Sequence, residues 1–291
     1  MLRARSGYKV FQSANYLFLS LLALLCLIPM VHVVSVSFSS APAVAAHEVT
    51  FWPIGPTLFS YKKALGSPEL YHSALVSVER ILLSFVIGLT ITCMAAYVLS
   101  KGEGRDGIGG YKFFVGFFVF AMLFNGGMIP MYLVVTKIGL YDSIWALVLP
   151  GAVNIFNLIL VMNFFKALPK ELEEAAFMDG ANHWTVFNKL FLPLSIPVLA
   201  TVGLFLIVND WNEWLAGSIY MKPNHVPLAT YLKSIISMPE INSNNVKVLA
   251  QTNFQALMSA QIVIGAVPIL VIYPVLQRFF AAGLVIGAVK E

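Results

Sequence analysis

The chain has 291 residues, of which 59% are apolar and 11% are charged. Soluble domains carry about 25% charged residues, so this composition excludes a globular protein with a water-covered surface and indicates a membrane protein. The net charge of +4 comes without a basic face carrying interleaved aromatic residues, which argues against nucleic-acid binding.

Six uncharged stretches follow one another along the chain, each close to the roughly 20 residues that a helix needs to cross a bilayer. They cover residues 16–38, 81–100, 113–136, 143–165, 190–209 and 257–276. Backbone amides in lipid must be paired within each segment, and the alternating polarity of barrel strands is not seen in the sequence. The sequence therefore predicts an all-α integral membrane protein with six transmembrane helices.

The first stretch is preceded by basic residues and followed by Ala43-Val44-Ala45, as the core of a secretory signal would be. Its apolar run exceeds the roughly 7–15 residues of a signal core, so we predict a retained helix. Six crossings put both termini on one side of the membrane. The side that carries the termini would hold eleven Lys and Arg residues and the other side six, with Arg80 counted on neither side. Because cytoplasmic loops carry an excess of Lys and Arg, this count predicts cytoplasmic termini.

The loop between the fourth and fifth stretches, residues 166–192, is cytoplasmic in this topology and contains a short predicted helix. Pro169 needs no amide partner in a first helical turn, and the glutamates that follow it suit the positive end of the helix dipole. Gly180 can adopt the left-handed conformation that ends a helix, and Asn182 is a candidate cap for a second short helix. The simpler alternative is an amphipathic loop lying on the lipid surface.

Amides, carboxylates and indoles lie close together at the outer end of the fifth stretch. Indole faces stack on the C–H surfaces of sugars, while amides and carboxylates pair with sugar hydroxyls, so this cluster predicts a saccharide path. The residues are Asn209, Asp210, Trp211, Asn212, Glu213 and Trp214. The alternative is an aromatic belt at the membrane interface with polar neighbours.

Two further positions are candidates for the substrate path. Arg80 stands at the head of the second stretch and would favour an anionic saccharide if it lined the path; the alternative is a snorkelling arginine at the outer interface. Asn125 interrupts the third stretch together with Gly126 and Gly127, where the alternative is close helix packing through small residues.

Glu174-Ala175-Ala176, separated by three residues from Gly180 and followed by Leu190, Leu192 and Pro193, resembles the EAA loop of ATP-binding-cassette (ABC) importer permeases in its carbohydrate form. The resemblance extends from about residue 71 to the end. It includes Asn125-Gly126-Gly127-Met128-Ile129-Pro130, Gly139-Leu140-Tyr141-Asp142-Ser143, Trp211-Asn212-Glu213-Trp214, and the tail with Gln277-Arg278-Phe279-Phe280 and Gly287-Ala288-Val289-Lys290. These segments look like the MalG-type branch, and more narrowly like permeases for oligo- and polysaccharides, which include the alginate importer.

The resemblance implies a MetI-like helical core over residues 71–291, with the coupling loop at 166–192 and a C-terminal tail at 277–291. Residues 1–70 would then form the cytoplasmic N-terminus, the first transmembrane helix and an outer loop. It also implies that a cytoplasmic EAA coupling helix docks in a cleft of an ATPase subunit. The residues expected to take part are Glu174, Ala175, Ala176, Phe177, Asp179, Gly180, Ala181 and Pro193.

The sequence contains no GxxxxGK[ST] phosphate loop, so ATP and Mg²⁺ are expected on partner ATPase subunits and no cofactor or metal on this chain. The implied partners are a second, different, MalF-like permease, two ATPase subunits, an extracytoplasmic solute-binding protein and membrane lipid. The chain is then a non-catalytic subunit in the bacterial cytoplasmic (inner) membrane. Its substrate would be an oligo- or polysaccharide, including one that contains uronate units.

Two other functions remain as alternatives. The first is an ion-coupled secondary transporter that uses Asp210 and Glu213 as proton carriers. The second is an intramembrane enzyme, which is disfavoured because neither HExxH nor a GxSxG elbow occurs. Cys26 and Cys93 lie in apolar runs without a CxxC pattern, so we expect small core residues and neither a disulfide nor a metal site.

Overall fold

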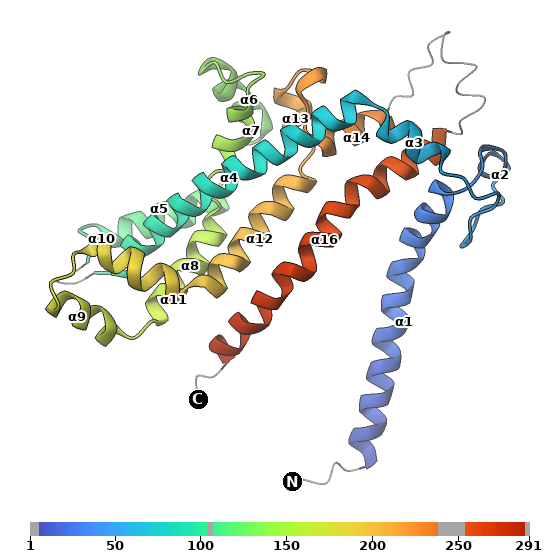
Figure 1. The fold of residues 1–291 in the computed structure, drawn as a ribbon. Coiled ribbons are helices and arrows are strands. Elements are labelled where there is room, and N and C mark those ends of the chain that lie inside the picture. Colours follow the sequence, from blue (N-terminus) through green and yellow to red (C-terminus); the bar gives the residue numbers. More distant parts are fainter. Residues whose placement is uncertain (1–5, 104–106, 238–253, 289–291) are drawn as a thin grey trace. The chain divides into compact units, whose positions relative to one another are not determined.

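A computed structural model describes residues 6–103, 107–237 and 254–288, and every regular element in these ranges is a helix (Figure 1). The elements, in order, are α1 (Ser6–Ser37), α2 (Ala41–Ala45), α3 (Phe59–Leu65), α4 (Pro68–Ser100), α5 (Tyr111–Leu123), α6 (Met128–Lys137), α7 (Ile144–Val148), η1 (Leu149–Gly151), α8 (Ile155–Ala167), α9 (Lys170–Met178), α10 (His183–Val186), η2 (Phe187–Phe191), α11 (Leu192–Leu194), α12 (Ile196–Asn212), α13 (Leu215–Tyr220), η3 (Pro223–His225), α14 (Leu228–Ser237) and α16 (Phe254–Ala288). The all-helical prediction agrees with this part of the chain.

Three helices are long and apolar enough to cross a membrane on their own, and up to six spans result if each bent helix pair counts as one. The single helices cover 11–37, 68–100 and 254–272. The bent pairs are α5 with α6, α7–η1 with α8, and the run from α10 to α11 with α12. Their bends are 112°, 48° and 79°, so three of the six stretches are broken in space. The break in the third stretch lies at the predicted interruption, Asn125-Gly126-Gly127.

The chain divides into two compact units. The first contains residues 1–70 and 232–267, and the second contains residues 71–231 and 268–291. In the first unit, Val36 at the end of α1 packs with Val44 and Val49 of the following loop and with Ala256 of α16. The hydroxyl of Ser35 donates to the carbonyl of Phe51 at 2.6 Å, which holds the loop against the helix.

The second unit has its main core between α4, α8, the α10–η2 segment and α12. Ala96, Val161 and Val202 are fully buried there, each from a different helix. Helices α4 and α12 approach closely at Gly203, because a Cβ at that position would lie 2.7 Å from the ring of Phe85. This contact fixes the two helices that carry the charged residues described below.

Helix α4 begins thirteen residues before the predicted start of the second stretch, at Pro68 rather than at residue 81. Arg80 therefore lies inside a helix and not at its head. The apolar run alone places the start too late, because Glu79 and Arg80 interrupt the uncharged pattern without interrupting the helix. Part of the predicted C-terminal tail, residues 289–291, lies outside the described ranges, and the structure does not describe the side chains of residues 277–288.

Candidate functional site

The predicted cytoplasmic loop forms a helix–turn–helix. Helix α9 begins at Lys170, with Pro169 at the cap position one residue before the predicted first turn. It ends at Met178, and Gly180, two residues later, has a φ of +82°, the left-handed conformation expected of a residue that terminates a helix. The Asn182 side chain accepts a hydrogen bond from the amide of Thr185 at 2.8 Å, as predicted for the cap of α10.

The two faces of α9 differ in exposure. Ala176 and Phe177 pack against the main core, and Ala181 follows them there after the turn. Glu174, Ala175 and Asp179 are exposed on the other side, together with Gly180. The predicted coupling residues thus divide into an inner set that anchors the helix and an outer set that another protein can reach. Pro193 lies apart from both sets, in the exposed α11 turn.

Helix α9 is tied to the end of α4 by a charged contact. The ammonium group of Lys101, directly after α4, forms an ion pair with Glu173 of α9. The same ammonium lies 4.3 Å from the centroid of the Tyr97 ring and 4.4 Å from that of Phe191. Because both side chains are largely buried, this contact is shielded from solvent and links the loop to a membrane-length helix.

A second charged cluster lies nearer the other end of α4, within the same unit. The guanidinium of Arg80 pairs with Asp210 at 3.3 Å and with Glu213 at 3.0 Å. The side chains of these three residues are 4%, 11% and 26% exposed, so one cation and two carboxylates are held away from solvent. A snorkelling Arg80 at the interface is therefore not what the structure shows.

Two adjoining hollows surround this cluster. The Arg80 hollow has a volume of about 270 Å³ and is lined by Arg80, Ser84, residues 146–148, Pro150, Gly151, Asn209, Asp210, Glu213, Ala216 and Tyr220. The Asn157 hollow has a volume of about 300 Å³ and is lined by Gly151, Asn154, Phe156, Asn157, Phe205, Leu206, Asn209 and Asp210. The two share Gly151, Asn209 and Asp210, which places them side by side.

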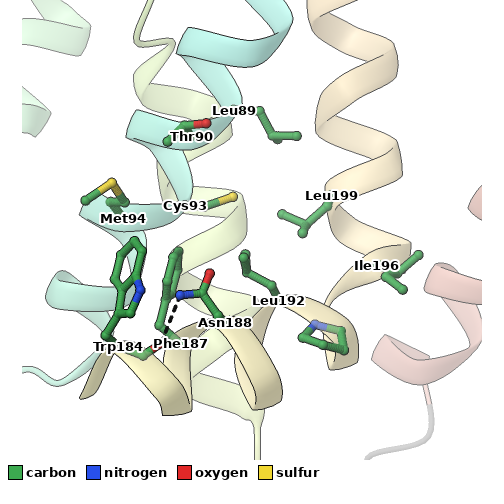
Figure 2. A pocket seen from close by; sticks show the side chains of 11 residues that line it. Leu89, Thr90, Cys93, Met94, Trp184, Phe187, Asn188, Leu192, Ile196 and Leu199 are labelled. Atoms are coloured by element: carbon green, nitrogen blue, oxygen red, sulfur yellow. Dashed lines mark hydrogen bonds between the residues drawn. The ribbon is translucent and has the colours of Figure 1, made fainter. Parts of the chain in front are cut away.

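A larger cavity of about 500 Å³ lies between the C-terminal half of α4 and the α10–α12 segment (Figure 2). Its lining is mostly apolar, with Cys93 and Met94 of α4 opposite Leu192, Ile196 and Leu199. Asn188 contributes an amide, but that amide donates to the carbonyl of Trp184 at 3.0 Å. The lining offers few hydroxyl or carboxylate partners, so the cavity does not suit a saccharide.

The structure brings together only part of the predicted substrate path. Arg80, Asn209, Asp210 and Glu213 share the Arg80 hollow. Trp211, Asn212 and Trp214 are not among the lining residues of either hollow, and the Asn212 amide instead donates to the carbonyl of Val208 in its own helix. Asn125 is exposed at the α5–α6 break, where its side chain accepts from the amide of Gly127 at 2.9 Å.

Sequence reasoning missed Ser84, Asn154 and Asn157, which also line the hollows. The two asparagines lie in the fourth stretch, whose one other side-chain amide is that of Asn163. Polar groups inside a predicted span are the signal that would have found them. The cysteine prediction agrees with the structure only for Cys93, which is buried; Cys26 is exposed on α1.

The chain is similar to a protein family, to a transport permease and to two solved structures. The family described as "Binding-protein-dependent transport system inner membrane component" matches residues 3–286. The polygalacturonan/rhamnogalacturonan transport system permease protein YtcP of Bacillus subtilis (strain 168) is 36% identical over 286 residues, covering 97% of this chain and 99% of that protein.

Two solved structures are similar to this chain. A chain of a bacterial ABC transporter involved in the import of the acidic polysaccharide alginate matches with a TM-score of 0.88 and 30% identity, covering 96% of this chain and 99% of that chain. A chain of a bacterial alginate ABC transporter in complex with an alginate pentasaccharide-bound periplasmic protein matches with a TM-score of 0.60 and 13% identity, covering 94% and 96% of the two chains. The second likeness concerns the fold alone.

Proposed function

Because this chain belongs to the family of binding-protein-dependent transport system inner membrane components, we propose that it is a transmembrane permease subunit of an ABC importer for a saccharide. The observation that carries this proposal is the full-length similarity to a polygalacturonan/rhamnogalacturonan transport permease, supported by the structural match to a chain of an alginate importer. The substrate would be an oligo- or polysaccharide delivered by a solute-binding protein and moved by alternating access.

The proposed topology has six crossings with both termini in the cytoplasm. Counting each bent helix pair as one span gives up to six spans of sufficient length and hydropathy. The excess of Lys and Arg on the side of the termini supports the orientation. The family description as an inner membrane component supports placement in the bacterial cytoplasmic membrane.

The proposed coupling element is α9 with the turn that follows it. Its outer set, Glu174, Ala175, Asp179 and Gly180, is exposed and available to an ATPase subunit. Its inner set packs on the main core, so a force applied to α9 is passed to the core rather than absorbed by a loose loop. Coupling of this kind requires that the ATPase contact differ between the inward-open and outward-open states.

The proposed partners follow from the same assignment. A second, MalF-like permease completes the path, and two ATPase subunits bind and hydrolyse ATP with Mg²⁺, since this sequence has no phosphate loop. An extracytoplasmic binding protein delivers the saccharide; the distant structural neighbour is itself a complex with such a periplasmic protein. This chain is then a non-catalytic subunit.

The experiment that tests the proposal is uptake into sealed vesicles containing the purified complex, with ATP and a proton gradient supplied separately. ATP-driven uptake that survives collapse of the gradient is the expected result. Uptake that continues without ATP and stops when the gradient collapses would favour the alternative, in which Asp210 and Glu213 carry protons.

A charge reversal tests the coupling element. Glu174→Lys should leave the protein inserted and the ATPase active while abolishing coupled uptake, because a cation replaces an exposed anion in the proposed docking face. Glu171→Lys is the matched control, since Glu171 is also exposed on the same helix but precedes the docking residues. Equal coupling in both variants would count against docking through Glu174.

A further inference from the structure

The two hollows around Asp210 lie where helices are interrupted. The α7–η1 and α8 segments meet at a 48° bend around Gly151 and Asn154, and α12 ends immediately before Glu213. Interrupted membrane helices expose backbone and side-chain polar groups that a continuous helix would hide, and such breaks mark binding sites in transporters. Both breaks open onto the same pair of hollows.

Asn157 is the most informative residue of the lining. It is only 3% exposed, and it lines the Asn157 hollow, where its side-chain amide can bind a polar occupant. Asn154, one turn earlier, uses its side-chain oxygen to accept from the Asn157 backbone amide at 3.2 Å, which leaves its own NH₂ group available.

The rest of the lining suits a sugar ring. Phe156 and Phe205 both face the Asn157 hollow, with their ring centroids 6.5 Å apart and the planes inclined by 45°. Their apolar faces can cover the C–H surface of a pyranose, while Asn154, Asn157 and the Asp210 carboxylate can bind its hydroxyls. The hollows of about 270 and 300 Å³ stand at the low end of the roughly 300–1,000 Å³ typical of ligand pockets, so they fit a short segment of a saccharide.

The charges of the lining select among sugars. Arg80 is the one cation among the residues that line the two hollows, and both of its neighbouring carboxylates pair with it. With both carboxylates ionised, the cluster carries one excess negative charge. Asp210, which faces both hollows, would lie beside the C6 carboxylate of a uronate unit and repel it in a poorly solvated site.

We propose that the Asn157 and Arg80 hollows form a subsite for neutral hexosyl units, in which Asn154, Asn157 and Asp210 bind the hydroxyls and Asp210 discriminates against uronates. This inference rests on the proposed function, because it places part of the saccharide path on this chain. It departs from the expectation that Arg80 selects an anionic sugar. The cation that would do so is already neutralised.

The test uses a cysteine as a reporter in the Arg80 hollow. Ser84→Cys is close to isosteric, and it is made in a chain whose own cysteines are replaced by serine. The complete importer, held in nanodiscs without nucleotide, is treated with a small methanethiosulfonate reagent, and labelling of this chain is followed by mass spectrometry. The probes are galactotriose and trigalacturonate, which differ by a carboxylate at C6 of each unit.

Galactotriose should slow labelling of the Ser84→Cys chain in proportion to the fraction of sites occupied, and trigalacturonate should not. Asn157→Leu should abolish the protection; Asn154→Ser, which retains a capping hydroxyl but removes the amide, should weaken it without disturbing the fold. Asp210→Asn should raise the affinity for trigalacturonate roughly tenfold, because the repelling charge is removed.

The control is a second chain that keeps Ser84 and Cys93 and has only Cys26 replaced by serine. Its Cys93 thiol lines the separate apolar cavity and should be labelled at the same rate with and without either probe. No protection by galactotriose, or equal protection by the two probes, overturns the inference. Protection of Cys93 equal to that of the Ser84→Cys thiol overturns it as well. None of these results depends on ATP, so failure of the subsite and failure of the importer assignment are separate outcomes.

Discussion

At the scale of single residues, the break between α5 and α6 depends on one glycine of the Asn125-Gly126-Gly127 run. Gly127 has a φ of +90° and a ψ of 168°, a region that side chains other than glycine essentially never adopt. Gly126 has no positive φ, and a Cβ added there would meet nothing within 4 Å among the described residues. The predicted alternative of close packing through small residues is therefore not seen at Gly126 in this part of the chain.

Gly127→Ala should lower the free energy of unfolding by about 1–3 kcal/mol, because the added Cβ forces a strained backbone or a different turn. Gly126→Ala is the matched control and should change it little. Thermal unfolding of both variants in detergent measures the difference. Equal destabilisation of the two would show that the backbone of Gly127 does not control the bend.

Asp142 connects the segment between α6 and α7 to the segment after α13 and should make their association depend on pH. Its carboxylate accepts from the backbone amide of Lys222 at 3.0 Å and also contacts the ammonium of Lys222 and the ring of His225. These contacts, the backbone hydrogen bond first, lower the pKa of Asp142 below its usual 3.8. A carboxyl group whose pKa is lower in the folded than in the unfolded protein stabilises the fold at pH values above the unfolded-state pKa. That stabilisation is lost as the pH falls through the folded-state pKa.

We expect the melting temperature of the wild type to fall more steeply below pH 4 than that of Asp142→Asn. Asn is the suitable replacement because Asp142 has a φ of +60°, which Asn tolerates. Other carboxylates titrate in the same range, so the difference between the two curves is the measurement. Parallel curves would mean that Asp142 contributes no pH-dependent stability.

Arg80 shows why residue types alone did not predict the charged cluster. The sequence identified Arg80, Asp210 and Glu213 as candidates, but it offered no sign that residues 130 and 133 positions apart would pair. That pairing requires α4 and α12 to lie together, which is a property of the fold. Without a partner in view, a snorkelling position at the interface was the simpler interpretation of a basic residue near a span.

At the scale of elements, the ion pair between Lys101 and Glu173 connects α4 to the proposed coupling helix. Lys101→Met should leave Glu173 largely buried without its cation and cost about 1–3 kcal/mol locally. The weaker contact between α4 and α9 should raise the number of ATP molecules hydrolysed per saccharide imported, while expression and membrane insertion stay unchanged. The exchange Lys101→Glu with Glu173→Lys should restore part of the coupling, because the pair is remade but the ring contacts of Lys101 are not.

The chain contains its own control for this experiment. Lys112 and Glu103 also form an ion pair, at 3.0 Å, but their side chains are 84% and 51% exposed. Exposed pairs contribute about 0–1 kcal/mol, so Lys112→Met should not change the ratio of ATP to saccharide. A similar rise in that ratio for both lysine variants would mean that a general loss of charge, and not the α4–α9 contact, causes uncoupling.

The spans themselves show what a hydropathy pattern can and cannot reveal about elements. Long uncharged runs predicted helices in all six places, because burial in lipid depends on composition along the chain. The bends were not predicted in the fourth and fifth stretches, although Pro150 with Gly151 and Pro193 with Pro197 stand near them. Proline marks a position where a helix can break, but its neighbours in space decide the angle.

At the scale of the whole molecule, the helical membrane class followed from composition, whereas the grouping of the helices did not. Residues 232–267 form one compact unit with residues 1–70, far away in sequence. No local sequence pattern links these segments. The window of α1 that is suited to a membrane has no buried residues within the described structure, so lipid or another subunit must cover it.

The orientation of the chain in the membrane is the property on which the coupling proposal depends most. Two exposed positions report on opposite sides: Ala175 on the outer face of α9 and Lys222 in the segment after α13. In a chain with Cys26 and Cys93 replaced by serine, Lys222→Cys should react with an impermeant maleimide in intact cells, whereas Ala175→Cys should react only in inside-out vesicles. The excess of Lys and Arg on the side of the termini is the physical basis of this expectation. Labelling of Ala175→Cys in intact cells would place α9 beyond the reach of a cytoplasmic ATPase and would remove the mechanical link between hydrolysis and transport.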